Sequence, residues 1–578
     1  MLGLQPPVYG KGPGPRMSTK PPYDGYVHYL SQPLMKTTCL FEGGVGRNIN
    51  GNMFALVRMM CTDSAYADYE LVYSVREALL AAARERFASY GLDRVYFVIS
   101  ESDEYNRYLA RAKYLWNDNT FPAYFTKREG QVYVNTWHGS GPKLLGMPDI
   151  QNSLRTFANV QKNLLAADYM VYPSEVTRDA YLRNYELAPF YNGTCLMHDY
   201  PRNDVFDNRG LYERVRAEQG IGTEQQVIAY MPTWRGAGRT AEGAEQVEII
   251  SRQLALIDAR LRDGQLFFVN LHFLVSSQLS YDNYRHIRPF PRGLETYDFL
   301  AACDVLVSDY SSVMFDYAVT GRPIVLFAYD EEEYLCDKKL FFPYREMPFP
   351  IANTAEELTD LLAGDLSGVI YPEFQQRFCA YHTGHATKSL LDLVFCGRTE
   401  GVNAIPCTPA PIDTALYVNN LGKKGKTDAL VREVLARADE HTALITTATY
   451  SERTIEAFRQ LDGHIPLFVI VRRHVQTREE ERLFELAQRN KFFNRLFEWR
   501  LRSYFAREAH QMLGDFHPRQ ICCLEPDGSY FMWMAKGLDC ERRAITGLIK
   551  SGKKTREAAA VCLAQGYTAE KGSPSSDT

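Results

Sequence analysis

The sequence predicts an α/β protein in which two Rossmann-like lobes follow one another and a smaller α/β region comes last. Three observations lead to this prediction. Short apolar runs alternate with helical periodicity from Thr37 onward, a second such series starts near Glu224, and a polar loop at 203–222 separates them. Repeated strand–helix units are typical of parallel sheets covered by helices. The chain therefore has the pattern of a doubly wound fold that occurs twice.

The first series predicts an N-terminal lobe at residues 24–210. Each apolar run is short enough for a buried strand, and each periodic stretch is long enough for a helix. The expected strands are 38–41, 70–73, 94–100, 131–137 and 168–172, and the expected helices are 52–60, 76–89, 103–113, 154–165 and 175–185.

The second series predicts a C-terminal lobe at residues 211–396. Its clearest unit is Asp304–Asp330, where an apolar run breaks at a serine-rich turn, an amphipathic run follows, and a second apolar run ends the stretch. Upstream, the expected strands are 226–230 and 266–271 and the expected helices are 247–262 and 296–302. Two such lobes in tandem form the GT-B architecture, in which ligands bind between the lobes at the carboxyl ends of the strands.

Three further segments complete the predicted organisation. Residues 1–23 and 566–578 are expected to be disordered tails, because the first is rich in Pro and Gly and the second is polar. A linker punctuated by Gly and Pro is expected at 397–412. Residues 413–565 restart the strand–helix pattern and predict an additional α/β domain, whose role the pattern leaves open.

Composition restricts the class of protein. A length of 578 residues corresponds to about three or four domains, and 46% apolar with 23% charged residues is ordinary for a globular protein. The formal charge of -5 gives no overall attraction to nucleic acid, so no nucleic-acid partner is expected. The 12 cysteines form no C-x-x-C pair, which favours a reducing cytoplasm over a disulfide framework. Without a signal-peptide core or an apolar run of 18 residues, the chain is expected to be neither secreted nor membrane-spanning.

Chemically useful side chains stand just beyond several predicted strands. His138 follows the strand at 131–137, and the neighbouring Gly139 and Gly141 allow a ligand to approach the backbone. Two arginines and a second histidine have equivalent places: Arg202, Arg235 and His272. Each residue alone is more simply explained as structural, so the hypothesis of a site depends on their convergence.

The turn before the amphipathic run of Asp304–Asp330 is a candidate phosphate site. Ser311 and Ser312 are expected to cap the following helix, whose unpaired N–H groups and dipole favour an anion. On this stretch alone, helix capping is the simpler explanation of both serines.

No motif indicates a metal ion or a cofactor. Asp309 and Asp316 fall on one short segment, where capping or core hydrogen bonds explain them better than Mg²⁺ binding. The run GKKGKT at 422–427 resembles a P-loop, but Asn420 stands where its first glycine should be. His382 and His385 have an H-x-x-H spacing without a third ligand and are expected to be surface residues.

Taken together, the motifs resemble those of the CDP-glycerol glycerophosphotransferase family, the teichoic-acid primases and polymerases with their ribitol-phosphate relatives. The similarity runs in the same order over about Thr37–Phe395. The motifs are FE-x4-R-x4-N from Phe41, NTWHGSGPKLLG, YPSE, YPRND, MPTWRG, LH and SDYSSVMFDYA-x3-RPIVLFAYD, of which the last is the most specific.

The resemblance implies transfer of glycerol phosphate, or another polyol phosphate, from a CDP-activated donor to a hydroxyl of a lipid-linked wall or capsule polymer, with release of CMP and without a cofactor. In-line phosphoryl transfer needs a positioned nucleophile and neutralised phosphate charge. The implied roles are general base for His138, donor diphosphate binding for His272, Arg235, Ser311 and Ser312, and polyol binding for Asp316; Lys143, Arg202 and Asp309 are further cleft candidates.

The chain departs from the family pattern in three places. The family usually reads WHGTPLK where this chain has WHGSGPK, so the proline moves to Pro142 while Lys143 is retained. Asp199 stands where a glycine commonly precedes YPRND, and HTGHA at 382–386 replaces Asp-Gly-x-Ala. These changes are expected to affect the choice of acceptor more than the type of reaction.

The helical run 481–514 has two interpretations. It carries seven Lys/Arg against four Glu with aromatics between them, so it either lies on the anionic inner face of the cell membrane or buries its aromatics in the last domain. Two alternatives to the transferase also stay open: a GT-B nucleotide-sugar glycosyltransferase of surface polysaccharide synthesis, and a non-catalytic assembly or binding module. The sequence does not distinguish glycerol from ribitol, or primase from polymerase.

Overall fold

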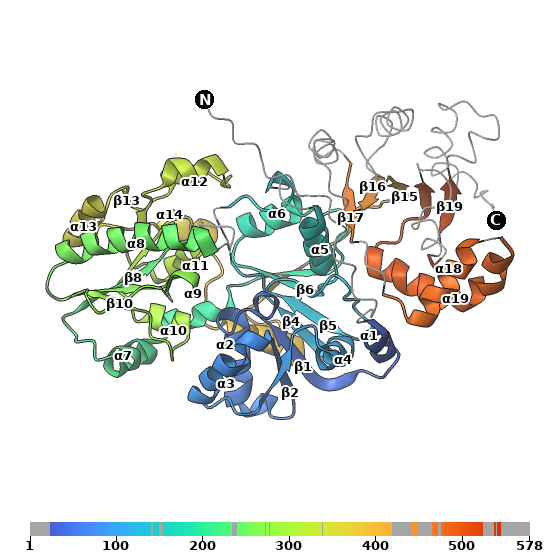
Figure 1. Cartoon of the computed structure of the whole chain (residues 1–578), viewed down its shortest axis with the longest axis horizontal. Helices are drawn as coiled ribbons and strands as arrows, with labels where there is room; N and C mark the ends of the chain where they lie inside the picture. The colour runs from blue at the N-terminus through green and yellow to red at the C-terminus, as the bar shows by residue number, and fades with distance from the viewer. Residues whose placement is uncertain are drawn as a thin grey trace, which may run out of the picture.

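Three α/β units lie side by side, with the first lobe between the second lobe and the last region (Figure 1). The structure is a computed structural model, and it describes residues 23–139, 141, 143–149, 154–233, 240–271, 273–276, 278–337, 339–418, 441–447, 465–471, 475–489, 491–523, 537–538 and 540–544. Both predicted tails, except Tyr23, are outside these residues, as are Arg235 and His272.

The first lobe is built on a sheet with strand order β14-β7-β6-β5-β4-β1-β2-β3. Its strands are β1 (Met35–Glu42), β2 (Glu70–Val75), β3 (Val95–Ile99), β4 (Ala112–Asn117), β5 (Val132–Asn135), β6 (Tyr169–Tyr172), β7 (Thr194–Met197) and β14 (Asn403–Pro406). All neighbours pair in parallel except β14, which runs antiparallel to β7. Helices cover both faces, so the inner strands are buried on both sides and appear in the sequence as apolar runs.

Two helices of this lobe begin at serine caps. Ser102 accepts a hydrogen bond from Tyr105 N, and Ser174 accepts one from Thr177 N, so each serine satisfies a free N–H group at a helix start. The helices are α1 (Tyr23–Leu30), α2 (Gly51–Thr62), α3 (Leu80–Ser89), α4 (Asp103–Arg111), α5 (Leu154–Leu165) and α6 (Glu175–Asn184), and the 3-10 helix η5 (Pro201–Asp207) leads to the second lobe.

The second lobe repeats this plan with a parallel sheet of order β10-β9-β8-β11-β12-β13. Its strands are β8 (Gln226–Met231), β9 (Gln265–Val269), β10 (Ile287–Pro289), β11 (Val305–Ser308), β12 (Ile324–Phe327) and β13 (Ile351–Ala352). Its helices are α7 (Arg209–Glu218), α8 (Thr240–Arg260), α9 (Phe273–Ser276), α10 (Thr296–Ala301), α11 (Val313–Tyr317), α12 (Glu331–Asp337), α13 (Ala355–Ala363) and α14 (Pro372–Phe378). The predicted unit at Asp304–Asp330 is β11, α11 and β12.

The last region is a third parallel sheet, with order β17-β16-β15-β18-β19 among the described residues. Its strands are β15 (Thr414–Tyr417), β16 (Thr442–Thr447), β17 (Leu467–Ile470), β18 (Gln520–Cys523) and β19 (Glu541–Ala544), and its helices are α18 (Arg478–Arg489) and α19 (Lys491–Leu513). The run GKKGKT at 422–427, which resembles a P-loop, lies outside the described residues.

The chain returns to the first lobe after the second, which the predicted boundaries did not include. Helix α15 (Ala386–Cys396) buries Leu390 and Leu391 in a first-lobe core that also contains Trp116. The segment expected to be a plain linker at 397–412 contributes β14 to the first sheet. The first lobe therefore includes residues from both sides of the second lobe.

Helix α5 joins the first lobe to the last region. Gln161 Nε2 donates to Leu467 O at 2.8 Å, and Val469 N donates to Gln161 Oε1 at 2.9 Å, so one buried side chain completes the edge of β17. Apolar residues of α5 and of β17 also belong to one core cluster. Because this contact is both apolar and hydrogen-bonded, the last region is part of the packed molecule.

Candidate active site

The loop that carries His138 starts with a strained residue. Trp137, just past β5, has φ +53, which is rare for a bulky side chain. Its backbone is held on both sides: Asn135 Oδ1 accepts from Trp137 N at 2.8 Å, and Asn52 Nδ2 donates to Trp137 O at 3.1 Å. Such strain persists only where the surroundings enforce it, and it is concentrated at functional sites.

The His138 ring is oriented by a backbone carbonyl. Its Nδ1 lies 3.0 Å from the carbonyl oxygen of Asp118, which directly follows β4. A carbonyl only accepts, so the neutral ring carries its proton on Nδ1 and presents an unprotonated Nε2. His138 is exposed to solvent at the surface of the loop. Protein atoms also crowd its ring and displace part of the surrounding water. Desolvation lowers the pKa of His138 below 6.5, the Asp118 hydrogen bond opposes this, and the Arg202 charge adds to it.

Arg202, in η5, connects the two lobes beneath this loop. Its Nη1 donates to the carbonyl of His138 at 3.0 Å, and its Nη2 contacts both carboxylate oxygens of Asp316 in α11 at 2.9 Å. Tyr297 donates a further hydrogen bond to Asp316 at 2.8 Å. Both members of the ion pair are buried, so the backbone of the His138 loop in one lobe is fixed to a helix of the other.

This pairing changes the expectation for Asp316. The resemblance implied that its carboxylate meets the polyol, but Arg202 and Tyr297 occupy both oxygens and the side chain is 2% exposed. We therefore assign Asp316 to the positioning of Arg202, and this role is a proposal.

Gly139 lies close to groups of both lobes. Its φ of +143 favours glycine, and a Cβ there would lie 3.1 Å from both Arg202 Nη2 and Ser312 Oγ. Tyr181 in α6 donates to the Gly139 carbonyl at 3.0 Å. The predicted His138 loop and the predicted serine turn therefore face one another across the cleft.

The serine turn differs in detail from the prediction. Ser312 is the residue before α11, but among the described residues its hydroxyl makes no capping hydrogen bond, and α11 has five residues. The hydroxyl faces Gly139 instead. Strands β8, β9 and β11 are adjacent and parallel, so the turn follows the same sheet edge as the ends of β8 and β9. Arg235 and His272 follow those two strands in sequence, outside the described residues.

Two other cleft candidates hold loops in place. Asp309 is fully buried, and it accepts hydrogen bonds from Thr233 N at 2.8 Å and from Thr233 Oγ1 at 2.7 Å. It thus anchors the chain that leaves β8. Lys143 forms an isolated antiparallel bridge with Leu340 of the second lobe, and its Nζ lies 5.7 Å from the centre of the Tyr334 ring.

The prediction that His382 is a surface residue is wrong. Its Nδ1 lies 2.5 Å from Asp199 Oδ2 and its Nε2 lies 2.8 Å from Asp207 Oδ2, with 16% of the side chain exposed. Desolvation lowers the pKa of His382, but the hydrogen bond and charge of Asp199, together with Asp207, outweigh it and raise the pKa. Two departures from the family pattern, Asp199 and His382, are therefore partners in one interaction.

Three residues of the site were missed by sequence reasoning. Asp118 stands directly after a strand. The reasoning that selected His138, which looks for polar side chains just beyond strands, could therefore have found Asp118 as well. Tyr181 and Tyr297 lie within helices and give no comparable signal. In the part of the chain that the structure describes, no three His, Cys, Asp or Glu side chains come together as metal ligands would.

Two Rossmann-like lobes whose loops meet at facing strand ends define the GT-B class, as predicted. The sequence profile of the family described as CDP-Glycerol:Poly(glycerophosphate) glycerophosphotransferase matches residues 26–396. The chain belongs to this family, and the resemblance of its motifs is confirmed.

The similar proteins carry names that place them in teichoic acid synthesis. The chain is 27% identical over 386 residues to the teichoic acid glycerol-phosphate transferase of Staphylococcus aureus, covering 63% of this chain and 95% of the relative. It is 27% identical over 390 residues to the teichoic acid poly(glycerol phosphate) polymerase of Staphylococcus epidermidis, covering 62% of this chain. It spans about half the length of that polymerase and of its Bacillus subtilis counterpart, 50% and 49%.

A solved structure supports the fold. The wall teichoic acid polymerase TagF matches with a TM-score of 0.54 and 22% identity, covering 65% of this chain and 94% of that chain. A TagF variant soaked with CDPG matches with a TM-score of 0.53 and 22% identity, covering 65% of this chain and 93% of that chain. The matched part leaves out more than a third of this chain.

Proposed function

We propose that this protein transfers a polyol phosphate, glycerol phosphate in the first instance, from a CDP-activated donor to a hydroxyl of a lipid-linked wall or capsule polymer. The observation that carries the proposal is the His138 ring, whose Nδ1 lies 3.0 Å from the Asp118 carbonyl oxygen, in a loop whose next residue, Gly139, faces Ser312 of the serine turn. The family and the names of the relatives agree with this reaction.

In the proposed reaction, His138 Nε2 takes the proton of the acceptor hydroxyl. The acceptor oxygen forms a bond to the phosphorus of the polyol phosphate, the bond from that phosphorus to the bridging oxygen breaks, and CMP leaves with the electron pair. Because the pKa of His138 is lowered, the ring is neutral and able to accept a proton at pH 7. A bound diphosphate would raise this pKa through its negative charge.

The donor diphosphate is proposed to lie against the second lobe. Ser311 and Ser312 would offer hydroxyl and backbone N–H groups there, with Arg235 and His272 as the further donor ligands expected from their motifs. Arg202 is proposed to act through the loop: it donates to the His138 carbonyl and is itself paired with Asp316. Lys143 and Asp309 are proposed to support the cleft by holding its loops.

Product analysis tests this function. The full chain is incubated with CDP-glycerol or CDP-ribitol and a synthetic lipid-linked acceptor, and the products are identified by mass spectrometry. We expect CMP release together with an acceptor heavier by one or more polyol phosphates, and loss of both in His138→Gln. Full activity of His138→Gln in a preparation free of other transferases would overturn the role of the base.

The same assay separates the two alternatives. Nucleotide release from UDP- or GDP-sugars, but not from CDP-polyols, would indicate a nucleotide-sugar glycosyltransferase. Donor binding without turnover on any acceptor would indicate a non-catalytic module. The number of added units distinguishes a primase from a polymerase.

We further propose that the protein works at the inner face of the cell membrane through α19. In this helix, Tyr504 and Phe505 are buried in the core of the last region, but Leu496 and Trp499 are 48% and 72% exposed on one face, beside exposed Arg500 and Arg502. Apolar side chains flanked by cations suit an anionic lipid surface. The structure contains no membrane-spanning helix within the described residues.

A further inference from the structure

Two cysteines from distant parts of the chain meet at the edge of the first sheet. Cys195 is the second residue of β7, and Cys407 directly follows β14, the strand that pairs with β7. Their Sγ atoms lie 3.4 Å apart, and both thiols are free. A disulfide holds its sulfurs about 2.05 Å apart, so a rotation of the two side chains that shortens this gap by about 1.4 Å would bring them into bonding distance.

The backbone holds the two cysteines together. In the antiparallel pair of strands, Ile405 is the partner of Cys195, and Cys407 N donates to Gly193 O at 2.9 Å. Residues two apart along a strand share one face of the sheet, so Cys407 is on the face of Ile405 and meets Cys195 diagonally. The contact between the sulfurs therefore follows from the strand register.

The two thiols differ in access and in acidity. Cys195 is fully buried, whereas Cys407 is half-buried, so a dissolved oxidant meets Cys407 first. The hydrogen bond from Cys195 lowers the pKa of Cys407 to about 7; desolvation opposes this shift, and the positive charge of Arg178 adds to it. The same hydrogen bond and burial raise the pKa of Cys195. Because the thiolate is the reactive form, Cys407 is suited to attack first and Cys195 to follow.

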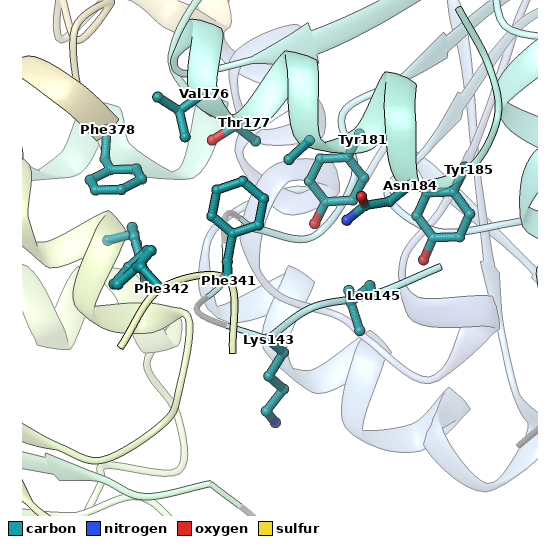
Figure 2. A pocket seen from close by; sticks show the side chains of 13 residues that line it. Lys143, Leu145, Val176, Thr177, Tyr181, Asn184, Tyr185, Phe341, Phe342 and Phe378 are labelled. Carbon is teal, nitrogen blue, oxygen red and sulfur yellow. The ribbon is translucent and has the colours of Figure 1, made fainter. Parts of the chain in front are cut away.

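The pair is separate from the proposed active site. Gly193, which is bonded to Cys407, precedes β7, whereas the cleft loops follow the carboxyl ends of the strands. Figure 2 shows Lys143 and Tyr181 in the wall of a small pocket between the lobes, and neither cysteine is part of that wall. A bond between the two sulfurs therefore leaves the cleft open.

Such a bond would close a very large ring of chain. Residues 195–407 include η5, every helix and strand of the second lobe, and α15. The two cysteines thus mark where the chain leaves the first lobe and where it has returned to it. A cross-link restricts the unfolded chain, and this restriction grows with the length of the closed ring. It would also fasten β14, and with it the start of the last region, to β7.

We propose that Cys195 and Cys407 are a reversible disulfide site that is oxidised by a small disulfide. The Cys407 thiolate attacks one sulfur of the oxidant, which gives a mixed disulfide and releases one small thiol. Cys195 then loses its proton to water and attacks Cys407 Sγ, which releases the second small thiol. The protein gives up two electrons and two protons, the oxidant takes them up as two thiols, and excess thiol reverses the exchange. This inference is independent of the proposed transferase.

Peptide mapping tests the bond directly. The full chain is incubated with oxidised glutathione, free thiols are alkylated, and tryptic fragments are identified by mass spectrometry without reduction. Trypsin releases Cys195 in fragment 184–202 and Cys407 in fragment 399–423, each with no other cysteine. We expect these fragments to be linked, and to separate after treatment with dithiothreitol. Recovery of both cysteines in alkylated form, or of Cys407 as a lasting glutathione adduct, would overturn the inference.

Three variants identify the roles of the thiols. Cys407→Ser should abolish the linked fragments, and Cys195→Ser should accumulate a glutathione adduct on Cys407, since the second thiol is missing. Cys336→Ser alters an exposed cysteine of α12 and should form the link as the parent does. An adduct on Cys195 in Cys407→Ser, with none on Cys407 in Cys195→Ser, would contradict the order of attack. If Cys195→Ser does not fold, the half-buried Cys407→Ser still decides whether the link depends on this pair.

Thermal melting measures the effect of the closed ring. The oxidised parent should melt several degrees above the reduced parent, because its unfolded chain is restricted across the second lobe. Cys407→Ser should melt at the same temperature with and without the oxidant. An oxidised parent that melts at or below the reduced one would contradict a bond that fits the native pairing of β7 and β14.

Discussion

His138 combines an exposed ring with a fixed tautomer, and its proposed role has a specific pH signature. Its pKa lies below 6.5, so the unprotonated fraction rises with pH and is complete before neutrality. We expect kcat/KM for the acceptor to rise along an acid limb with a midpoint below 6.5 and to level off by pH 7. A donor diphosphate bound as proposed would raise this pKa, so the limb of kcat should lie at higher pH.

As a control, removal of the His138 imidazole should also remove the acid limb of the pH profile. His138→Gln should lower kcat by roughly 10²–10⁴-fold, the usual contribution of a general base, and its residual rate should no longer follow the acid limb. An acid limb that persists in His138→Gln would assign the titration to another group.

The buried pair Arg202–Asp316 should matter for stability and turnover in different ways. Asp316→Ala leaves the guanidinium buried without its counter-charge, so the free energy of unfolding should fall by roughly 3–5 kcal/mol. Combining it with Arg202→Met should recover much of that loss but not activity, because the His138 carbonyl loses its donor. Chemical denaturation and turnover measure the two effects separately.

An exposed ion pair provides the comparison. Arg209 and Glu213 in α7 are 75% and 63% exposed, and Glu213→Ala should change the free energy of unfolding by less than about 1 kcal/mol. Equal costs for Asp316→Ala and Glu213→Ala would contradict the buried bridge between the lobes.

At the level of secondary-structure elements, His382 ties the segment between α14 and α15 to the turn after β7 and to η5. A histidine with a raised pKa stabilises the fold fully below its unfolded value of 6.5 and loses this contribution as pH rises through its folded value. His382→Gln should therefore lower the melting temperature at pH 6 and have a smaller effect at pH 9. Asp204 and His198 lie nearby and titrate as well, so the difference between variant and parent is the quantity to compare.

The partner variant checks the origin of this effect. Asp199→Asn removes the carboxylate that raises the pKa of His382, so the melting temperatures of Asp199→Asn and of the double variant with His382→Gln should differ little at pH 6. A large remaining difference would mean that Asp207 or another group holds the proton.

The sequence predicts well those elements that are determined by neighbouring residues in the chain. Parallel strands buried on both faces appear in the sequence as apolar runs. The places of His138, Arg202 and the Ser311–Ser312 turn just beyond such strands predicted that they lie in one cleft. Interactions between distant residues gave no local signal. Asp199 and His382 are 183 positions apart, Arg202 and Asp316 are 114 apart, and α15 returns to the first lobe only because that lobe's core accepts its leucines.

For the molecule as a whole, Gln161 makes two of the hydrogen bonds that join the first lobe to the last region. Gln161→Leu leaves Val469 N and Leu467 O buried without their partner, at roughly 1–3 kcal/mol for each group. We expect faster hydrogen exchange in peptides covering 465–471. Gln375→Leu, which removes one hydrogen bond to Ala318 O within the second lobe, should leave these peptides unchanged. Equal protection in both variants would contradict a role of Gln161, and the apolar contact with the hydrogen bonds from α19 would then hold the regions together.

The exposed face of α19 leads to a prediction about where the whole molecule works. Vesicles containing anionic lipid should bind the protein in flotation assays, less so at high salt, because Arg500 and Arg502 are screened by ions. Trp499→Ala should reduce this binding, since the indole inserts at the lipid surface. Ile370 is also 72% exposed but lies in the second lobe, so Ile370→Ala is the matched control and should bind as the parent does. Equal losses in both variants, or salt-independent binding to neutral vesicles, would remove α19 as the contact, because exposed apolar area alone would then explain the adsorption.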